Sequence, residues 1–193
     1  ADGNLMASTP RNAPKWRLFR FTGARFAPVP APKESAPDAT LHLLRDTAGT
    51  LWVNSTNYLG RLSSNGWVSA ISTNEIPAGG IVGIGPARGG GWWVADRKEL
   101  RWFKDGAWLA SRPQGETNLT LSDMNQLLED NSGNVWETAI NRGLWLHRPD
   151  GTTNYFGRKN GLVSSQLRTV FQDRENNLWI GTGGGLTRFK RRA

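Results

Sequence analysis

The chain has 193 residues and a formal net charge of +8, and 37% of its residues are hydrophobic. This length and apolar content are enough for one or two domains with a core, and the lack of cysteine excludes a disulfide framework, a thiolate metal site and a cysteine nucleophile. The positive charge suits an anionic partner, but the basic residues are spread along the chain, which does not favour nucleic-acid binding.

No apolar run approaches the ~18–20 residues that cross a bilayer. The first residues also lack the basic start and the apolar middle of a signal peptide. We therefore expect no membrane insertion by this chain itself, and we expect any export signal or anchor to lie outside it. The 23 glycines and 10 tryptophans favour short strands and many turns over long helices.

A repeat of about 42 residues organises the chain. A leucine marks each copy, and the spacings between successive markers are 41, 41, 44 and 42 residues. The markers are Leu18, Leu59, Leu100, Leu144 and Leu186. Such regularity is the first signal to use in assigning a fold.

In chain order, each copy holds four short strand-like runs. The first run is apolar, as in 41–44, 124–128 and 167–171, and an Asp-x-x-Gly turn follows it. The aspartate of such a turn can accept hydrogen bonds from the turn amides, and glycine takes the left-handed conformation without steric cost. The second run carries a tryptophan, the third contains the marker leucine, and the fourth follows a second glycine turn.

Four antiparallel strands in a unit of this length predict one propeller blade. Apolar residues that are adjacent along a strand agree with sheets covered on both faces, and the 3.6-residue spacing of helical repeats is missing. We therefore predict an all-β fold, a β-propeller built from four-stranded antiparallel blades. The expected single array covers 1–193, with a partial blade at 1–30, blades at about 38–72, 79–112 and 120–157, and a partial blade at 165–193. Because the end blades are incomplete, we expect the chain to be part of a larger propeller.

The last copy, V-F-Q-D-R-E-N-N-L-W-I-G-T-G-G-G-L-T-R-F over 170–189, closely resembles the two-component-regulator propeller repeat. The resemblance is good around Trp52 and Trp136 and weak around Trp93. Asn176 stands where the repeat usually has a turn glycine, and asparagine tolerates a positive φ. Met6 replaces the tryptophan in the first copy, and methionine fills a similar volume.

This resemblance implies the sensor region of bacterial hybrid histidine kinases and related signalling proteins. Such a region lies on the periplasmic or extracellular side of the membrane. It binds a ligand, often a carbohydrate, or mediates dimer contacts, and it passes a signal to an output domain without catalysis. The resemblance implies no cofactor and no metal.

Candidate ligand-binding residues lie in the variable loops. In propellers, the loops between second and third strands and those between blades share one face of the ring, and loops vary where the scaffold repeats. We predict that this face binds an oligosaccharide or an anionic small ligand, although a solvated rim would have the same composition. The predicted residues are Tyr58, Arg97, Lys98, Asn141, Arg142, Arg158 and Asn160.

Other conspicuous residues are assigned to the scaffold. The glycines of 183–185 lie between two predicted strands, whereas a phosphate loop leads from a strand into a helix. Aspartates that recur at equivalent turns indicate a structural role, because catalysis needs a few convergent groups. Tryptophans in register are expected in the core. Three lie off that register and are weaker core candidates, namely Trp16, Trp92 and Trp145.

Two alternative functions remain open at this stage. A streptogramin-lyase-like or glycan-active propeller enzyme has a similar period, but it needs a histidine at the mouth of the ring, and both His42 and His147 fall within predicted strands. A pure protein-interaction scaffold is the other alternative. Exposed strand edges can pair with other strands, so the scaffold alternative includes a homodimer through the propeller edges.

Overall fold

A computed structural model describes residues 6–8, 18–35, 40–71, 74–113, 125–139 and 141–190. In these ranges every regular element is a β-strand, apart from the short 3-10 helix η1 (Arg158–Asn160). None of the described residues forms a helix of the length and apolarity that a membrane span requires. The chain separates into two compact units, Ala1–Ile81 and Val82–Ala193.

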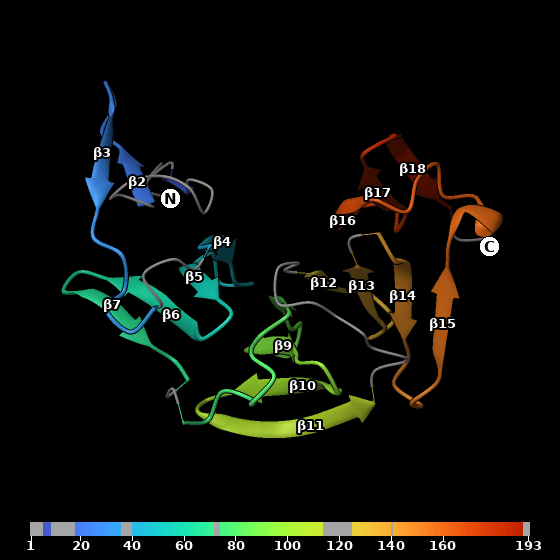
Figure 1. The fold of residues 1–193 in the computed structure, drawn as a ribbon, viewed down its shortest axis with the longest axis horizontal. Coiled ribbons are helices and arrows are strands. Elements are labelled where there is room, and N and C mark those ends of the chain that lie inside the picture. The colour runs from blue at the N-terminus through green and yellow to red at the C-terminus, as the bar shows by residue number, and fades with distance from the viewer. Residues whose placement is uncertain are drawn as a thin grey trace. The chain divides into compact units, whose positions relative to one another are not determined.

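The first unit contains two antiparallel sheets, in which strands adjacent in sequence pair with one another (Figure 1). Blade 1 consists of β1 (Met6–Ser8), β2 (Leu18–Phe21) and β3 (Phe26–Val29). Blade 2 consists of β4 (His42–Arg45), β5 (Leu51–Ser55), β6 (Tyr58–Ser63) and β7 (Gly66–Ser69). Their buried core comprises Leu18, Leu41, Val53 and Tyr58.

The second unit contains three further blades of the same type (Figure 1). Blade 3 consists of β8 (Gly83–Pro86), β9 (Trp92–Ala95), β10 (Glu99–Lys104) and β11 (Ala107–Pro113). Blade 4 consists of β12 (Asn125–Glu129), β13 (Val135–Ala139), β14 (Gly143–His147) and β15 (Thr153–Phe156). Blade 5 consists of β16 (Leu167–Gln172), β17 (Leu178–Thr182) and β18 (Gly185–Phe189).

The consecutive antiparallel pairing confirms the predicted all-β fold of four-stranded propeller blades. The runs expected at 41–44 and 167–171 form β4 and β16. Gly183 and Gly184 connect β17 to β18, which begins at Gly185. Met124, expected in the first strand of blade 4, lies outside the described residues. The grouping of all repeats into one array with the stated blade bounds stays a prediction.

The Asp-x-x-Gly turns have the predicted geometry. In blade 2, the amide of Gly49 donates to the carbonyl of Asp46 at 3.0 Å, and the Asp46 carboxylate accepts from the amide of Thr50 at 2.8 Å. In blade 5, Asn176 takes the glycine position with a φ of 63°, which confirms the expected positive φ. Residues that tolerate the left-handed region therefore occupy the positive-φ position of these turns.

The turn aspartate also binds the tryptophan of its own blade, which the sequence analysis did not anticipate. The indole Nε1 of Trp52 donates to Asp46 Oδ2 at 2.8 Å. The equivalent bonds join Trp136 to Asp130 at 2.9 Å and Trp179 to Asp173 at 2.7 Å. Because one carboxylate closes the turn and satisfies the indole N–H, the two residues recur together.

Blades 3 and 4 are joined through their backbones. β8 pairs with β12 in parallel, with Gly83 opposite Asn125 and Ile84 opposite Gln126, so the two blades form one eight-stranded sheet. A Cβ at Gly85 would lie 1.9 Å from the carbonyl oxygen of Leu127. Only glycine allows the two strands to approach this closely.

Blades 4 and 5 are joined by side chains, through a shared buried core and through hydrogen bonds such as those of Gln126. The Oε1 of Gln126 accepts from the amide of Val170 at 3.0 Å and from the hydroxyl of Thr169 at 2.8 Å. Its Nε2 donates to the carbonyl of Val170 at 3.0 Å. The side-chain amide of Gln126 thus binds the backbone of β16, whereas blades 3 and 4 are joined by direct strand pairing.

Candidate functional site

Tyr58 does not lie where the sequence prediction placed it. It begins β6 instead of standing in the preceding loop, and its side chain is 1% exposed in the core of blade 2. Its ring lies over Gly60, where a Cβ would be 2.1 Å from the hydroxyl oxygen. Burial, followed by the charge of Glu34, raises the pKa of Tyr58 to about 12. The expected exposure of this residue was therefore wrong, because the apolar ring packs inward.

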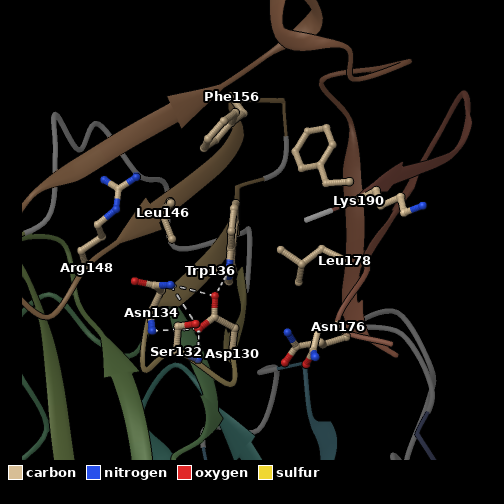
Figure 2. Close-up of a pocket in the computed structure, with 12 residues that line it drawn as sticks. Asp130, Ser132, Asn134, Trp136, Leu146, Arg148, Phe156, Asn176, Leu178 and Lys190 are labelled. Atoms are coloured by element: carbon tan, nitrogen blue, oxygen red, sulfur yellow. Dashed lines mark hydrogen bonds between the residues drawn. The ribbon is translucent and has the colours of Figure 1, made fainter. Parts of the chain in front are cut away.

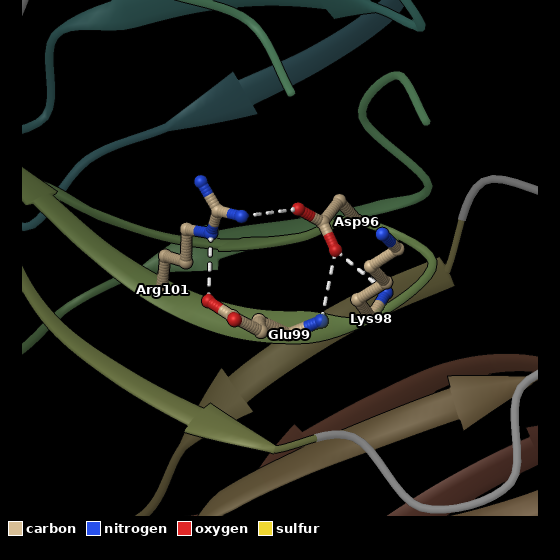
Figure 3. Close-up of polar contacts among 4 residues, drawn as sticks. All are labelled: Asp96, Lys98, Glu99 and Arg101. Atoms are coloured by element: carbon tan, nitrogen blue, oxygen red, sulfur yellow. Dashed lines mark hydrogen bonds and ion pairs between the residues drawn. The ribbon is translucent and has the colours of Figure 1, made fainter. Parts of the chain in front are cut away.

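Arg97 and Lys98 lie in the turn between β9 and β10, and both are exposed. The buried Asp96 holds this turn, since its Oδ1 accepts from the amides of Lys98 and Glu99 at 2.6 and 2.8 Å (Figure 3). Its Oδ2 forms an ion pair with Arg101 at 3.0 Å. The carboxylate thus organises the loop and leaves the side chains of Arg97 and Lys98 at the surface.

The remaining predicted residues also lie in loops. Asn141, exposed and with a φ of 61°, and the half-buried Arg142 form the turn between β13 and β14. Arg158 and Asn160 are exposed in η1, where Asn160 Oδ1 accepts from the amide of Gly157 at 2.9 Å. Asn160 therefore stabilises its own loop. Ligand binding by these residues stays a prediction.

A pocket of about 500 Å³ lies between blades 4 and 5, beside the turns that join the first and second strands (Figure 2). Blade 4 and blade 5 each supply one wall. The lining residues are Asp130, Ser132, Asn134, Trp136, Leu146, Arg148, Phe156, Gln172, Asn176, Leu178, Phe189 and Lys190. This volume is typical of small-molecule sites.

Aromatic and aliphatic side chains form the apolar part of the pocket. The rings of Trp136 and Phe156 lie 5.7 Å apart at 37°, and those of Phe156 and Phe189 lie 5.7 Å apart at 53°. Leu146 and Leu178 complete this surface. Tilted rings at this separation attract one another beyond their shared burial, so the wall is held in place by its own packing.

The carboxylate of Asp130 lies at the polar end of the pocket and is fully engaged. It accepts from the amides of Ser132 and Asn134, from the Asn134 side chain and from the Trp136 indole, at 2.8 to 3.2 Å. Burial opposes ionisation, but the bonds from Asn134, Trp136 and the turn amides outweigh it and hold the pKa of Asp130 below its ordinary value. Asp130 is therefore ionised at neutral pH and has a structural role.

Two cationic residues lie on opposite walls. Arg148 follows β14, and its NH1 donates to Thr152 Oγ1 at 3.3 Å and to Asn154 Oδ1. Lys190 follows β18 and is exposed. Figure 2 shows Arg148 beside blade 4 and Lys190 beside blade 5. The walls thus combine aromatic rings with positive charge.

The sequence analysis missed this pocket because its walls come from different repeats. Asp130 and Trp136 are separated from Phe189 and Lys190 by more than one repeat, and each looks like ordinary scaffold within its own copy. Aligning the copies and asking which residues of neighbouring blades face each other would have found it. The loop-based prediction instead used the second-to-third-strand turns.

The lining of this pocket does not include His147, Trp92 or Trp145. His147 is 2% exposed, and its Nε2 lies 2.9 Å from Glu137 Oε2. His42 is half-buried in β4, and burial lowers its pKa. Trp92 is buried and Trp145 half-buried, whereas Trp16 lies outside the described residues. In the described ranges, no group of three or more His, Asp or Glu side chains is placed to hold a metal ion.

Together, the antiparallel blades and their repeated turns define the chain as a β-propeller protein. Residues 161–184, which include β16, the Asp173 turn and β17, match the family model of the two component regulator propeller. The chain therefore carries the repeat of that family, as the resemblance of 170–189 indicated. No curated protein shows significant similarity to the chain.

Solved structures give the same fold. The extracellular domain of the hybrid two component system BT4673 from B. thetaiotaomicron is 17% identical, with a TM-score of 0.70 over 100% of this chain and 26% of that chain. The corresponding domain of BT3049 from the same organism is 16% identical, with a TM-score of 0.70 over 97% of this chain and 26% of that one. The chain thus spans about a quarter of these two domains.

Enzymes share this fold as well. A catalytically inactive virginiamycin B lyase from Staphylococcus aureus, solved with quinupristin, is 16% identical. Its TM-score is 0.60 over 91% of this chain and 63% of the lyase. At such identities the similarity establishes the architecture, and function has to be argued from the site.

Proposed function

We propose that the chain is the ligand-recognition part of a sensor propeller in a bacterial signalling protein, on the periplasmic or extracellular side of the membrane. The observation that carries this proposal is the pocket between blades 4 and 5, one wall of which belongs to the repeat that matches the two component regulator propeller. The similar extracellular domains of hybrid two component systems support the same role.

The pocket favours binding without conversion of the ligand. Both oxygens of its carboxylate, Asp130, accept hydrogen bonds from the turn and from Trp136. The carboxylate therefore has no free lone pair directed at a substrate proton. Neither histidine lines the pocket. General acid–base catalysis needs a titrating group within hydrogen-bond reach of the reacting atom.

A site between two blades also suits signalling. A ligand that contacts both walls binds best to one arrangement of blades 4 and 5, and it therefore shifts the population toward that arrangement. Gln126 is the side chain that bridges the inner strands of these blades. Contacts made through side chains allow more adjustment than a continuous strand pairing.

An oligosaccharide or an anionic small molecule is the ligand type that we propose, and a homodimer through blade edges remains the scaffold alternative. The enzyme alternative rests on the likeness to virginiamycin B lyase. It draws little support from His147, which is buried against Glu137, or from His42, which lies within β4.

The proposal is tested with the purified 193-residue chain and a panel of neutral and acidic oligosaccharides. We expect a rise in Tm that grows with ligand concentration, because a ligand that binds only the folded chain stabilises it by about 2.7 kcal/mol at 100 times Kd. Mass spectrometry should recover the ligand unchanged. A product would favour the enzyme, and no shift with any compound, together with a stable dimer, would favour the scaffold.

A further inference from the structure

We infer that the pocket between blades 4 and 5 binds a ring-bearing monoanion, with the ring against the aromatic wall and the acid group at Arg148. This inference rests on the proposed function and names the ligand chemistry of that site. A sugar acid and an aromatic carboxylate share the required features, a six-membered ring and one acid group.

The hydrogen-bonding groups left in the pocket are mostly donors. The acceptors of Asp130 are occupied, Gln172 Oε1 accepts from the amide of Asn131 at 3.1 Å, and Asn176 Oδ1 accepts from the Asn131 side chain. These bonds leave the NH₂ groups of Gln172 and Asn176 as donors. Among the described lining side chains, the amide oxygen of Asn134 and the hydroxyl of Ser132 carry further acceptor lone pairs.

The charge of the lining points the same way. Arg148 and Lys190 contribute two positive charges, whereas Asp130 contributes the negative one. The Asp130 charge is shielded by the turn amides, Asn134 and the indole, which bind both of its oxygens. An entering anion therefore meets cationic donors and can form charge-assisted hydrogen bonds with them, which a neutral ligand cannot match.

Arg148 is prepared to bind an acid group. Its NH1 is held by Thr152 and Asn154, which fixes the plane of the guanidinium group. The remaining guanidinium N–H groups can pair with a carboxylate in a fork geometry, which is stronger and more directional than the point charge of a lysine. Lys190 adds attraction from the other wall but less orientation.

The aromatic wall selects for a ring. Trp136, Phe156 and Phe189 form a chain of rings with centroids 5.7 Å apart, and two leucines extend it. Aromatic faces pack against flat rings and against the apolar C–H faces of sugars. The volume of about 500 Å³ admits one or two six-membered rings.

Calorimetric titration of the full chain tests the inference with four probes. Glucuronate and benzoate carry the acid group on a sugar and on an aromatic ring, and glucose and benzyl alcohol are their neutral counterparts. We expect at least one anion to bind at least tenfold more tightly than its neutral counterpart, with weaker binding at 0.3 M than at 0.03 M salt. The anion that binds identifies the source of the ligand.

Variants assign the binding to this pocket. Arg148→Gln should weaken binding of the anion at least tenfold, Arg148→Lys should restore part of it, and Lys190→Gln should weaken it about threefold. Arg168→Gln, which removes an exposed cation from β16 outside the lining, is the matched control and should leave binding unchanged. Circular dichroism and Tm verify that each variant folds.

Three outcomes would overturn the inference and leave the proposed function in place. These are equal binding of anions and neutral counterparts, unchanged binding in Arg148→Gln, and loss of binding in Arg168→Gln instead. If the anions fail while a neutral oligosaccharide of the wider panel binds, the ligand chemistry is wrong but the sensor role stands. If nothing in the panel binds, both proposals fail.

Discussion

Blade 4 meets blade 3 and blade 5 in different ways. Towards blade 3, strands β12 and β8 pair directly, and Gly85 lets them approach. Towards blade 5, the side chain of Gln126 spans the gap, and a pocket remains between the walls. The difference shows that one repeat can build both a continuous sheet and a pocket between two blades.

The tryptophans show the same contrast. Blade 4 satisfies the indole of Trp136 with its own Asp130, whereas blade 3 has Ala87 at the equivalent turn position. The indole of Trp93 donates instead to Glu129 Oε2, in β12 of blade 4, at 2.8 Å. The same oxygen accepts from the amide of Arg88 at 2.8 Å. Blade 3 therefore depends on its neighbour for a contact that blade 4 makes within itself.

Gly85→Ala should have the largest effect, because its methyl group would overlap the Leu127 carbonyl and force β8 away from β12. We expect a loss of about 3 kcal/mol in the free energy of unfolding, measured with urea. Gly183→Ala is the control, because there the new Cβ meets the flexible end of Gln166. Equal losses in both variants would contradict the strand pairing.

Glu129→Ala should cost about 2 kcal/mol, because it leaves the Trp93 indole and the Arg88 amide without their acceptor. A double-mutant cycle isolates the bond. The cost should shrink in a Trp93→Phe background and stay unchanged in a Trp136→Phe background. The reverse pattern would show that Glu129 does not act across the blades.

Gln126→Ala should cost less, about 1 kcal/mol, because water can replace part of the bonds to Thr169 and Val170 at this boundary. Urea unfolding measures the change. Gln166→Ala, at an exposed residue next to β16, should be neutral within about 0.5 kcal/mol. A loss for Gln126→Ala as large as that for Gly85→Ala would remove the contrast between the two boundaries.

The smallest effect on stability is expected from lowering the pH. Hydrogen bonds hold the pKa of Asp130 below 3.8, its ordinary value, so the unfolded chain binds protons before the folded one as the pH falls. The stabilising contribution is complete at neutral pH and is lost below about pH 4. Asp130→Asn should therefore flatten the fall of Tm between pH 5 and pH 3, and an unchanged slope would contradict this assignment.

The sequence predicted the architecture because repetition is visible in one dimension. The even spacing of the marker leucines predicted the blades, and Asn176 was correctly expected to have a positive φ. The fifth marker behaves differently, since Leu186 is 61% exposed whereas Leu144 is fully buried. Equivalent positions in a repeat share a strand and a register, but their burial depends on what covers each face.

The site was harder to predict, because it depends on contacts between copies. Tyr58 was misplaced because a polar hydroxyl near a loop suggested exposure, although its ring fills the space above Gly60. The weak third copy did contain a signal: Ala87 in place of the turn aspartate implies that the Trp93 indole needs another acceptor. Finding Glu129 required knowing which strand lies beside it.

Glu129 is the last residue of β12 and Asp130 follows it, and the two make contacts on opposite sides of blade 4. Glu129 reaches the indole and amide of blade 3, and Asp130 holds the turn that borders the pocket. A single peptide bond links them, so a shift of this strand end by a fraction of an ångström alters both contacts at once. A ligand that shifts the Asp130 turn would therefore also shift Glu129. Its binding should be detectable as altered solvent exchange of the Trp93 indole proton, which Glu129 accepts.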